Sequence, residues 1–87
     1  MIHELKTDPE AFGASFLGDK HYELRRDDRH FEEGDLLILR ETELSGEQMA
    51  EGAPLLYTGR VLSRIVTHKL EGYGLQPEWV ILSVRPI

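Results

Sequence analysis

The sequence predicts a small α+β domain that is mainly β, in which about five strands form a pseudo-barrel with one N-terminal helix packed at its end. Three observations lead to this fold class. The chain has 87 residues, enough for a single domain (1–87) with one core. Its apolar runs are strand-sized, and only a segment near the N-terminus carries strong helix signals. Strands this short need closure to bury a core and to hide their edges.

The helix is predicted between a first strand at Ile2–Lys6 and the glycine at position 18. Thr7 and Glu10 have the spacing of a capping box at its start. Phe12 and Phe16 are four residues apart and therefore share one face. A helix of only two to three turns must be held by tertiary packing.

The other strands are predicted from alternating or β-branched apolar residues. The acidic segment 43–56 contains Gly and Pro, which predicts a long, solvated, mobile loop, with a short helix over Gly46–Glu51 as an alternative. Tyr57–Gly59 is interpreted as a turn. The predicted strands are Tyr22–Arg26, Leu36–Thr42, Arg60–Glu71 and Trp79–Val84.

Composition limits the function. The formal net charge is −6, so sequence-independent binding of nucleic-acid phosphates over the whole surface is not expected. Any binding of nucleic acid must come from a local pocket. There is no cysteine and the four histidines lack metal-site spacing, so neither a metal nor another cofactor is predicted. No apolar run could span a bilayer and no signal-peptide pattern is present, so we expect a cytoplasmic protein without a membrane partner.

The most informative stretch is Gly18–Asp35, which is dense in charge. Glu23 and Arg25 have the same strand parity, and Lys20 lies in the turn before them. Either this charged face points into the barrel, where the charges must pair with each other or with a ligand, or it is solvated and Tyr22 and Leu24 face the core. Parity alone does not decide between these interpretations.

The pattern Gly18-x-Lys20-x-x-Glu23-x-Arg25 resembles the signature of ASCH domains, a group within the PUA-like superfamily. The chain looks most like a small, uncharacterised branch of that group found in bacteria and phages. The resemblance covers nearly the whole chain except Glu43–Leu56. The matching residues are His3–Lys6, Tyr22–Arg29, Phe31, Gly34-Asp35, Tyr57–Arg60 and Trp79–Ser83.

This resemblance implies a PUA-like pseudo-barrel with a cleft against the helix that accepts RNA or a modified nucleotide or nucleoside. Some ASCH proteins resemble amidohydrolases that deacylate modified cytidine with a Lys, a Thr and a Glu. Lys20 matches the lysine, whereas Glu23 stands at the threonine position and lacks its hydroxyl. Lys20 and Glu23 are the catalytic candidates, and Glu41 and Glu71 are candidates for the family's glutamate.

The same residues suit a binding pocket. Arg25 offers a planar fork of donors to a phosphate or base edge, Glu23 could accept from an exocyclic amine, and Lys20 could neutralise phosphate. Four aromatic residues are candidates for base stacking or for core packing: Tyr22, Tyr57, Tyr73 and Trp79. Arg29, Arg60 and Tyr57 are predicted at the rim of the pocket. His3 and Lys6 are predicted to reach it from the first strand, with a hydrogen-bonded structural histidine as the alternative for His3.

Arg60, Arg64 and His68 share one strand parity and form a candidate stripe for binding the nucleic-acid backbone, or else a solvated strand face. Three functions therefore remain open. The first is a module that binds RNA or a modified nucleotide, the second is a hydrolase of acylated nucleosides, and the third is a protein-interaction or inhibitor domain that uses the acidic loop. The sequence does not indicate an oligomeric state.

Overall fold

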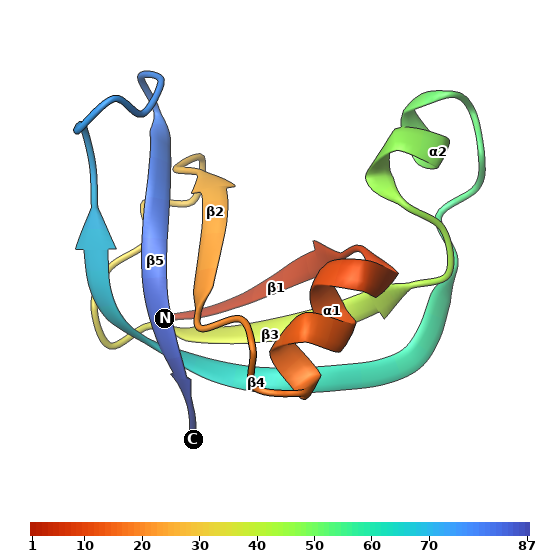
Figure 1. Ribbon diagram of the computed structural model, residues 1–87, viewed down its shortest axis with the longest axis horizontal. Coiled ribbons are helices and arrows are strands. Elements are labelled where there is room, and N and C mark those ends of the chain that lie inside the picture. The colour runs from red at the N-terminus through yellow and green to blue at the C-terminus, as the bar shows by residue number, and fades with distance from the viewer.

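The computed structural model describes residues 1–87 and contains one five-stranded sheet and two helices (Figure 1). The strand order in the sheet is β1-β3-β4-β5-β2, with β1 parallel to β3 and all other neighbours antiparallel. The elements in chain order are β1 (Ile2–Thr7), α1 (Pro9–Phe16), β2 (Tyr22–Arg26), β3 (Leu36–Thr42), α2 (Gly46–Ala50), β4 (Tyr57–Leu70) and β5 (Trp79–Pro86).

The sheet is curled into a half-barrel because β4 is long and is shared by two neighbours. The first part of its 14 residues pairs with β3 and the second part with β5. The β4–β5 register shifts between Val66 and His68, an irregularity of the kind that bends a strand and increases its twist. The predicted class, a mainly β α+β domain with an N-terminal helix, is confirmed. The two edge strands, β1 and β2, are not paired with each other.

The core lies on the concave side of the sheet, under α1. Phe12 of α1 is fully buried, whereas Phe16 is 58% exposed. Both rings lie beside the Arg60 guanidinium, at 5.1 and 4.8 Å, so they do share a face but only one of them enters the core. The buried apolar residues are Leu5, Phe12, Phe31, Leu37, Leu39, Val66, Val80, Leu82 and Val84.

The start of α1 differs from the predicted capping box. Thr7 is the last residue of β1, it is buried, and its hydroxyl donates to the Leu5 carbonyl oxygen at 3.3 Å. The N-cap is Asp8, whose side chain caps none of the first α1 amides. Its carboxylate instead accepts a hydrogen bond of 3.0 Å from the Gly46 N–H. The Thr7–Glu10 expectation is therefore wrong, because the strand takes Thr7 before the helix begins.

The segment 43–56 contains a short helix, as the alternative interpretation held. Ser45 caps α2 in a true capping box with Gln48, through bonds of 3.1 and 2.9 Å. No residue of α2 is buried. The turn predicted at Tyr57–Gly59 is wrong, because β4 already begins at Tyr57, which pairs with Thr42.

Candidate functional site

The charged face of β2 points into the molecule. Glu23 is 2% exposed, while Tyr22 and Leu24 on the opposite face are 49% and 50% exposed. The structure therefore decides between the two interpretations of this strand: Tyr22 and Leu24 do not face the core. A carboxylate buried in this way must be paired, because isolated charges are costly to bury.

Lys20, Glu23 and Arg25 form a tightly connected triad. The Lys20 Nζ lies 2.5 Å from one carboxylate oxygen of Glu23. The other oxygen accepts bonds from Arg25 Nη2 at 2.8 Å and Nε at 3.2 Å. The three side chains thus meet at one place, as their spacing predicted. Both oxygens of Glu23 are already engaged, so Glu23 neutralises the cations and is not open to accept from a base amine.

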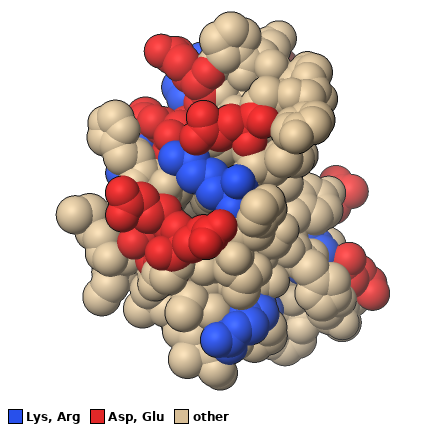
Figure 2. All heavy atoms as spheres, turned by 90° about the vertical axis from the view of Figure 1, so that its left-hand side faces the viewer, with Lys and Arg blue, Asp and Glu red and all other residues tan.

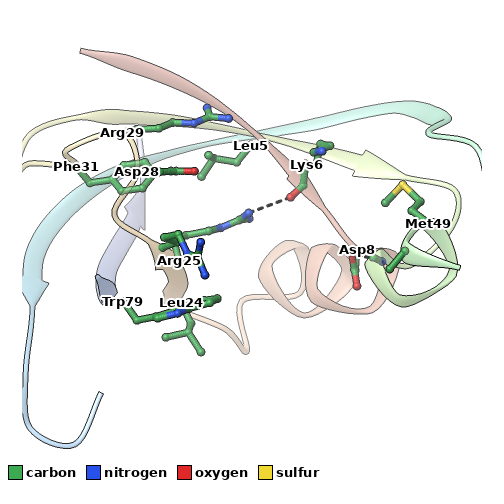
Figure 3. A pocket seen from close by; sticks show the side chains of 13 residues that line it. Leu5, Lys6, Asp8, Leu24, Arg25, Asp28, Arg29, Phe31, Met49 and Trp79 are labelled. Atoms are coloured by element: carbon green, nitrogen blue, oxygen red, sulfur yellow. Dashed lines mark hydrogen bonds between the residues drawn. The ribbon is translucent and has the colours of Figure 1, made fainter. Parts of the chain in front are cut away.

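Two arginines connect the open edge strands of the sheet. Arg25 Nη1 donates to the Lys6 carbonyl oxygen at 3.1 Å (Figure 3). Arg25 Nη2 lies 3.4 Å from the Thr7 hydroxyl. Arg29 donates to the Glu4 carbonyl oxygen in the same strand. Side chains therefore link β2 and the loop after it to β1, where a closed barrel would have a backbone ladder.

A cleft of about 680 Å³ opens between β2, β1 and α2, a volume within the range of small-molecule sites. Figure 3 shows Arg25 reaching into it from β2, with Asp8 and Met49 on the opposite side. A smaller hollow of about 360 Å³ lies beside it and contains the triad. The two share Lys6, Asp8, Leu24 and Arg25. The remaining lining residues of the larger cleft are Leu5, Arg26, Asp28, Arg29, Phe31, Gly46, Met49, Ala50 and Trp79.

The cleft is cationic although the protein is acidic. Four cationic side chains and only two carboxylates line it, in a chain of net charge −6. Lys6, Arg26 and Arg29 make no ion pair with any acid. Figure 2 shows one face of the protein, on which basic side chains lie in a strip between two acidic groups. The unpaired cations of the cleft are therefore the groups open to an anionic ligand.

An aromatic side chain lines the same cleft. Trp79, the first residue of β5, is partly exposed, and the Arg26 guanidinium lies 5.8 Å from its ring centroid. Neither Trp79 nor Tyr22 belongs to the core, so both are open to contact a ligand. Lys20 Nζ lies 4.9 Å from the Tyr22 ring, beside the smaller hollow.

Three of the predicted binding residues lie away from the cleft. His3 is buried, its Nε2 is 2.9 Å from an Asp35 carboxylate oxygen, and its ring packs edge-on against Phe31. Tyr57 stacks with Arg40, whose guanidinium is 3.7 Å from its ring centroid. Neither Tyr57 nor Arg60 lines the cleft or the triad hollow.

The candidate stripe on β4 is also engaged within the protein. Arg60 lies over the two phenylalanines of α1, and Arg64 Nη2 donates to the Ser15 carbonyl oxygen at 3.0 Å. His68 Nδ1 is 3.4 Å from a Glu33 carboxylate oxygen. These three side chains fasten α1 and a loop to the sheet. Contacts within the protein therefore account for the stripe, and no bound nucleic-acid backbone is needed to explain it.

The residues considered for hydrolysis are not assembled around the triad. The Glu41 carboxylate accepts a hydrogen bond of 2.8 Å from the Thr58 hydroxyl, and Glu71 pairs with Lys69 at 3.3 Å. Neither glutamate lines the cleft or the triad hollow. Lys20 and Glu23 are paired with each other.

The loop that supplies Asp28 and Arg29 is fixed by Asp27. One Asp27 oxygen accepts from the Phe31 N–H at 2.8 Å, and the other lies 2.8 Å from Lys69 Nζ. Burial pushes the pKa of Asp27 upward, but the hydrogen bonds from Lys69 and Phe31 and the Lys69 charge outweigh it and hold this pKa below its ordinary value. The bond to Asp27 in turn raises the pKa of Lys69 above its ordinary value, against the opposing effect of burial.

Several lining residues were not predicted from the sequence. Arg26 could have been found, since it directly follows Arg25 on an edge strand. Asp8 and Met49 gave no signal, because α2 and the start of α1 come together only in the folded chain, 38 positions apart at the Gly46–Asp8 bond. No group of three metal-ligating side chains is close enough to hold a metal ion, and none of the helices has the length and apolar character needed to cross a membrane.

Comparison with known families places the chain in one of them. Residues 2–84 match the model of a domain of unknown function, DUF3850. The chain belongs to the DUF3850 family. No curated protein matches it. In this DUF3850 domain the match spans every strand that lines the cleft, from β1 through β2 to the start of β5.

Proposed function

We propose that this DUF3850 domain binds RNA or a modified nucleotide or nucleoside in the cleft between β2, β1 and α2. The observation that carries the proposal is the set of cations without acidic partners, Lys6, Arg26 and Arg29, beside the partly exposed Trp79. A phosphate neutralises such cations, and a base stacks on such a ring. A ligand that carries both a phosphate and a base therefore matches the groups that line this cleft.

The number of phosphates engaged is small. The three unpaired cations are confined to one cleft, and the rest of the protein surface is acidic on balance. A long duplex would meet repulsion outside the cleft, so a nucleotide or a short single-stranded segment is the ligand that fits the charge distribution.

The fold supports the further proposal that the domain is related to ASCH and other PUA-like proteins. The resemblance implied a mainly β pseudo-barrel with an N-terminal helix, and this chain has a curled half-barrel with that helix. It also implied a pocket at Lys20, Glu23 and Arg25, and these side chains adjoin the cleft. We propose binding rather than hydrolysis, because Glu23 stands at the position of the nucleophile and is fully paired.

Calorimetric titration with nucleoside monophosphates and a short single-stranded RNA tests the proposal. We expect Arg26→Ala and Trp79→Leu each to weaken binding about tenfold, since a charge-assisted hydrogen bond or a stacked base contributes about 1–3 kcal/mol. Arg85→Ala is the matched control, because Arg85 is exposed and lines neither the cleft nor the triad hollow. Absence of binding by the unaltered protein, or equal losses in Arg85→Ala, would reject the cleft as a nucleotide site.

A further inference from the structure

The outer edge of β2 carries main-chain groups that no strand pairs. In an antiparallel pair, residues alternate between those whose N–H and C=O bond to the neighbour and those whose groups point away. The β5 neighbour bonds to His21 through Val84 N–H at 3.0 Å and to Asp27 through the Glu78 carbonyl oxygen at 2.6 Å. The odd-numbered residues of this stretch therefore face β5, and Tyr22, Leu24 and Arg26 face outward.

Two other contacts agree with this alternation. The Tyr22 carbonyl oxygen accepts from Lys20 Nζ at 2.6 Å, so it does point away from β5. The Trp79 N–H bonds to the Gln76 carbonyl oxygen at 3.1 Å and leaves its register partner Arg26 without a backbone bond. Because Lys20 occupies the Tyr22 oxygen, the unoccupied groups run from the Leu24 N–H and C=O to the Arg26 N–H and C=O.

The main-chain acceptors on the opposite wall of the cleft are already occupied. The carbonyl oxygens of Glu4 and Lys6 on the β1 edge accept bonds from Arg29 and Arg25. The ligand therefore meets a wall of guanidinium groups on the β1 side and a main-chain edge with free donors and acceptors on the β2 side.

We infer that this edge, from Leu24 to Arg26, reads the Watson–Crick edge of an unpaired base in the cleft. This inference rests on the proposed nucleotide-binding function and adds the element that recognises the base. The N–H and C=O of Leu24, and those of Arg26, each present a donor next to an acceptor on this edge. Every unpaired base offers a complementary acceptor and donor on its Watson–Crick edge. A base already paired in a duplex has none to offer, so the ligand class is a single-stranded or extruded nucleotide.

The length of the open edge favours a base over a peptide strand. Leu24 and Arg26 are two residues apart, and at a rise of about 3.3 Å per residue they span about 7 Å. That is the width of one base, whereas a peptide added to a sheet edge needs several residues of free edge to gain affinity from main-chain bonds. Strand alternation also places Arg25 on the concave side of this edge and Leu24 and Arg26 on the other side. A base that lies in the plane of the sheet therefore has an arginine on each face.

Nuclear magnetic resonance of the backbone amides tests the inference directly. The nitrogen-15-labelled protein is titrated with AMP, CMP, GMP and UMP, and separately with a five-residue acidic peptide. We expect the Leu24 and Arg26 amides to shift on addition of a nucleotide, and the Glu23 and Arg25 amides, which face β5, to shift much less. This internal control separates edge recognition from a general change in the cleft.

Substitution supplies the second measurement. Leu24→Pro removes the N–H at an edge position, where proline is tolerated, and Leu24→Ala shortens the same side chain but keeps the N–H. We expect Leu24→Pro to bind the best nucleotide about tenfold more weakly than Leu24→Ala, the loss of about one hydrogen bond. If Leu24→Pro does not fold, the amide pattern of the unaltered protein decides the inference alone.

The outcomes distinguish this inference from the proposed function. If nucleotides bind but the alternation of shifts is absent, or if Leu24→Pro and Leu24→Ala bind alike, edge recognition is overturned and the nucleotide site stands. If only the acidic peptide shifts the Leu24 and Arg26 amides, the edge accepts a strand and both proposals fail. If no nucleotide binds, both fail as well. A duplex that binds as tightly as a single strand also overturns edge recognition.

Discussion

The guanidinium of Arg25 donates a hydrogen bond of 3.1 Å to the main-chain oxygen of Lys6 and so connects β2 to β1, the two edge strands of one sheet. The same guanidinium holds the buried carboxylate of Glu23. A single side chain therefore neutralises a buried charge and bridges the open side of the half-barrel. The cleft exists because this connection is a side chain, which leaves room where backbone pairing would leave none.

Arg25→Ala should destabilise the domain. It leaves Glu23, which is 2% exposed, with Lys20 as its only cationic partner, and it releases β1 from β2. Breaking a buried pair costs about 3–5 kcal/mol, and because Arg25 is partly solvated we expect about 2 kcal/mol here. Urea unfolding at neutral pH measures this loss, with Arg85→Ala as the control. A loss below about 0.5 kcal/mol, the range of ordinary surface substitutions, would show that the bridge is not structural.

The Asp27–Lys69 pair should make stability depend on pH in a defined direction. The pKa of Asp27 is lowered from 3.8, so its contribution is present above that pH and is lost as the pH falls through the folded-state pKa. The pKa of Lys69 is raised from 10.5, so its contribution is present below that pH and is lost as the pH rises through the folded-state pKa. Between the folded-state pKa values of Asp27 and Lys69, both side chains are charged and the ion pair contributes to stability.

Asp27→Asn tests this dependence, since Asn can still accept the Phe31 N–H bond but carries no charge. We expect a loss of about 1 kcal/mol near neutral pH, because the two side chains remain partly exposed. The difference from the unaltered protein should shrink as the pH falls below 3.8. Chemical unfolding at a series of pH values measures it, and a difference that is constant across the acid range would contradict the assigned pair.

Much of the strand structure was predictable because it depends on local patterns. Alternating, β-branched or continuous apolar residues mark most of the strands, and the capping residues of α2, Ser45 and Gln48, are only three positions apart in the sequence. Thr7 shows the limit of such signals. It has the spacing of a helix cap, yet pairing of β1 with β3 extends the strand through it, and the tertiary requirement overrides the local one.

The candidate site was predictable only in part. Parity grouped Glu23 with Arg25, but only the folded sheet shows that their side faces inward. Parity did not reveal that Arg60 packs against α1, because parity gives the face of a strand and not the neighbour that covers it. The α2 wall, with Met49, depends on a contact between distant segments, and no periodic pattern records such a contact.

Replacing residues 45–53 with a short Gly/Ser linker should separate folding from binding. None of the α2 residues is buried, so we expect the free energy of unfolding to change by less than about 1 kcal/mol, a small part of a typical total. Affinity for the best nucleotide should fall, because Gly46, Met49 and Ala50 form one wall of the cleft. Urea unfolding and calorimetric titration of the same preparation measure the two effects. A loss of several kcal/mol in stability would show that the segment is packed.

Nucleotide binding should depend only weakly on salt. Each phosphate neutralised on a single strand contributes about 0.7 to the slope of log affinity against log salt concentration. Lys6, Arg26 and Arg29 are the cleft cations without acidic partners, so we expect one to three phosphate contacts with a short single-stranded RNA and a slope of about −0.7 to −2.

Single substitutions show how much each cation contributes to the slope of log affinity against log salt concentration. Arg26→Ala should make it shallower by about 0.7, one phosphate contact, while Arg85→Ala should leave it unchanged because its side chain lies outside the cleft. Titrations at several salt concentrations give the slopes. A steep slope that Arg85→Ala reduces as much as Arg26→Ala would mean that the RNA binds over the surface as a polyanion and that the cleft does not select it.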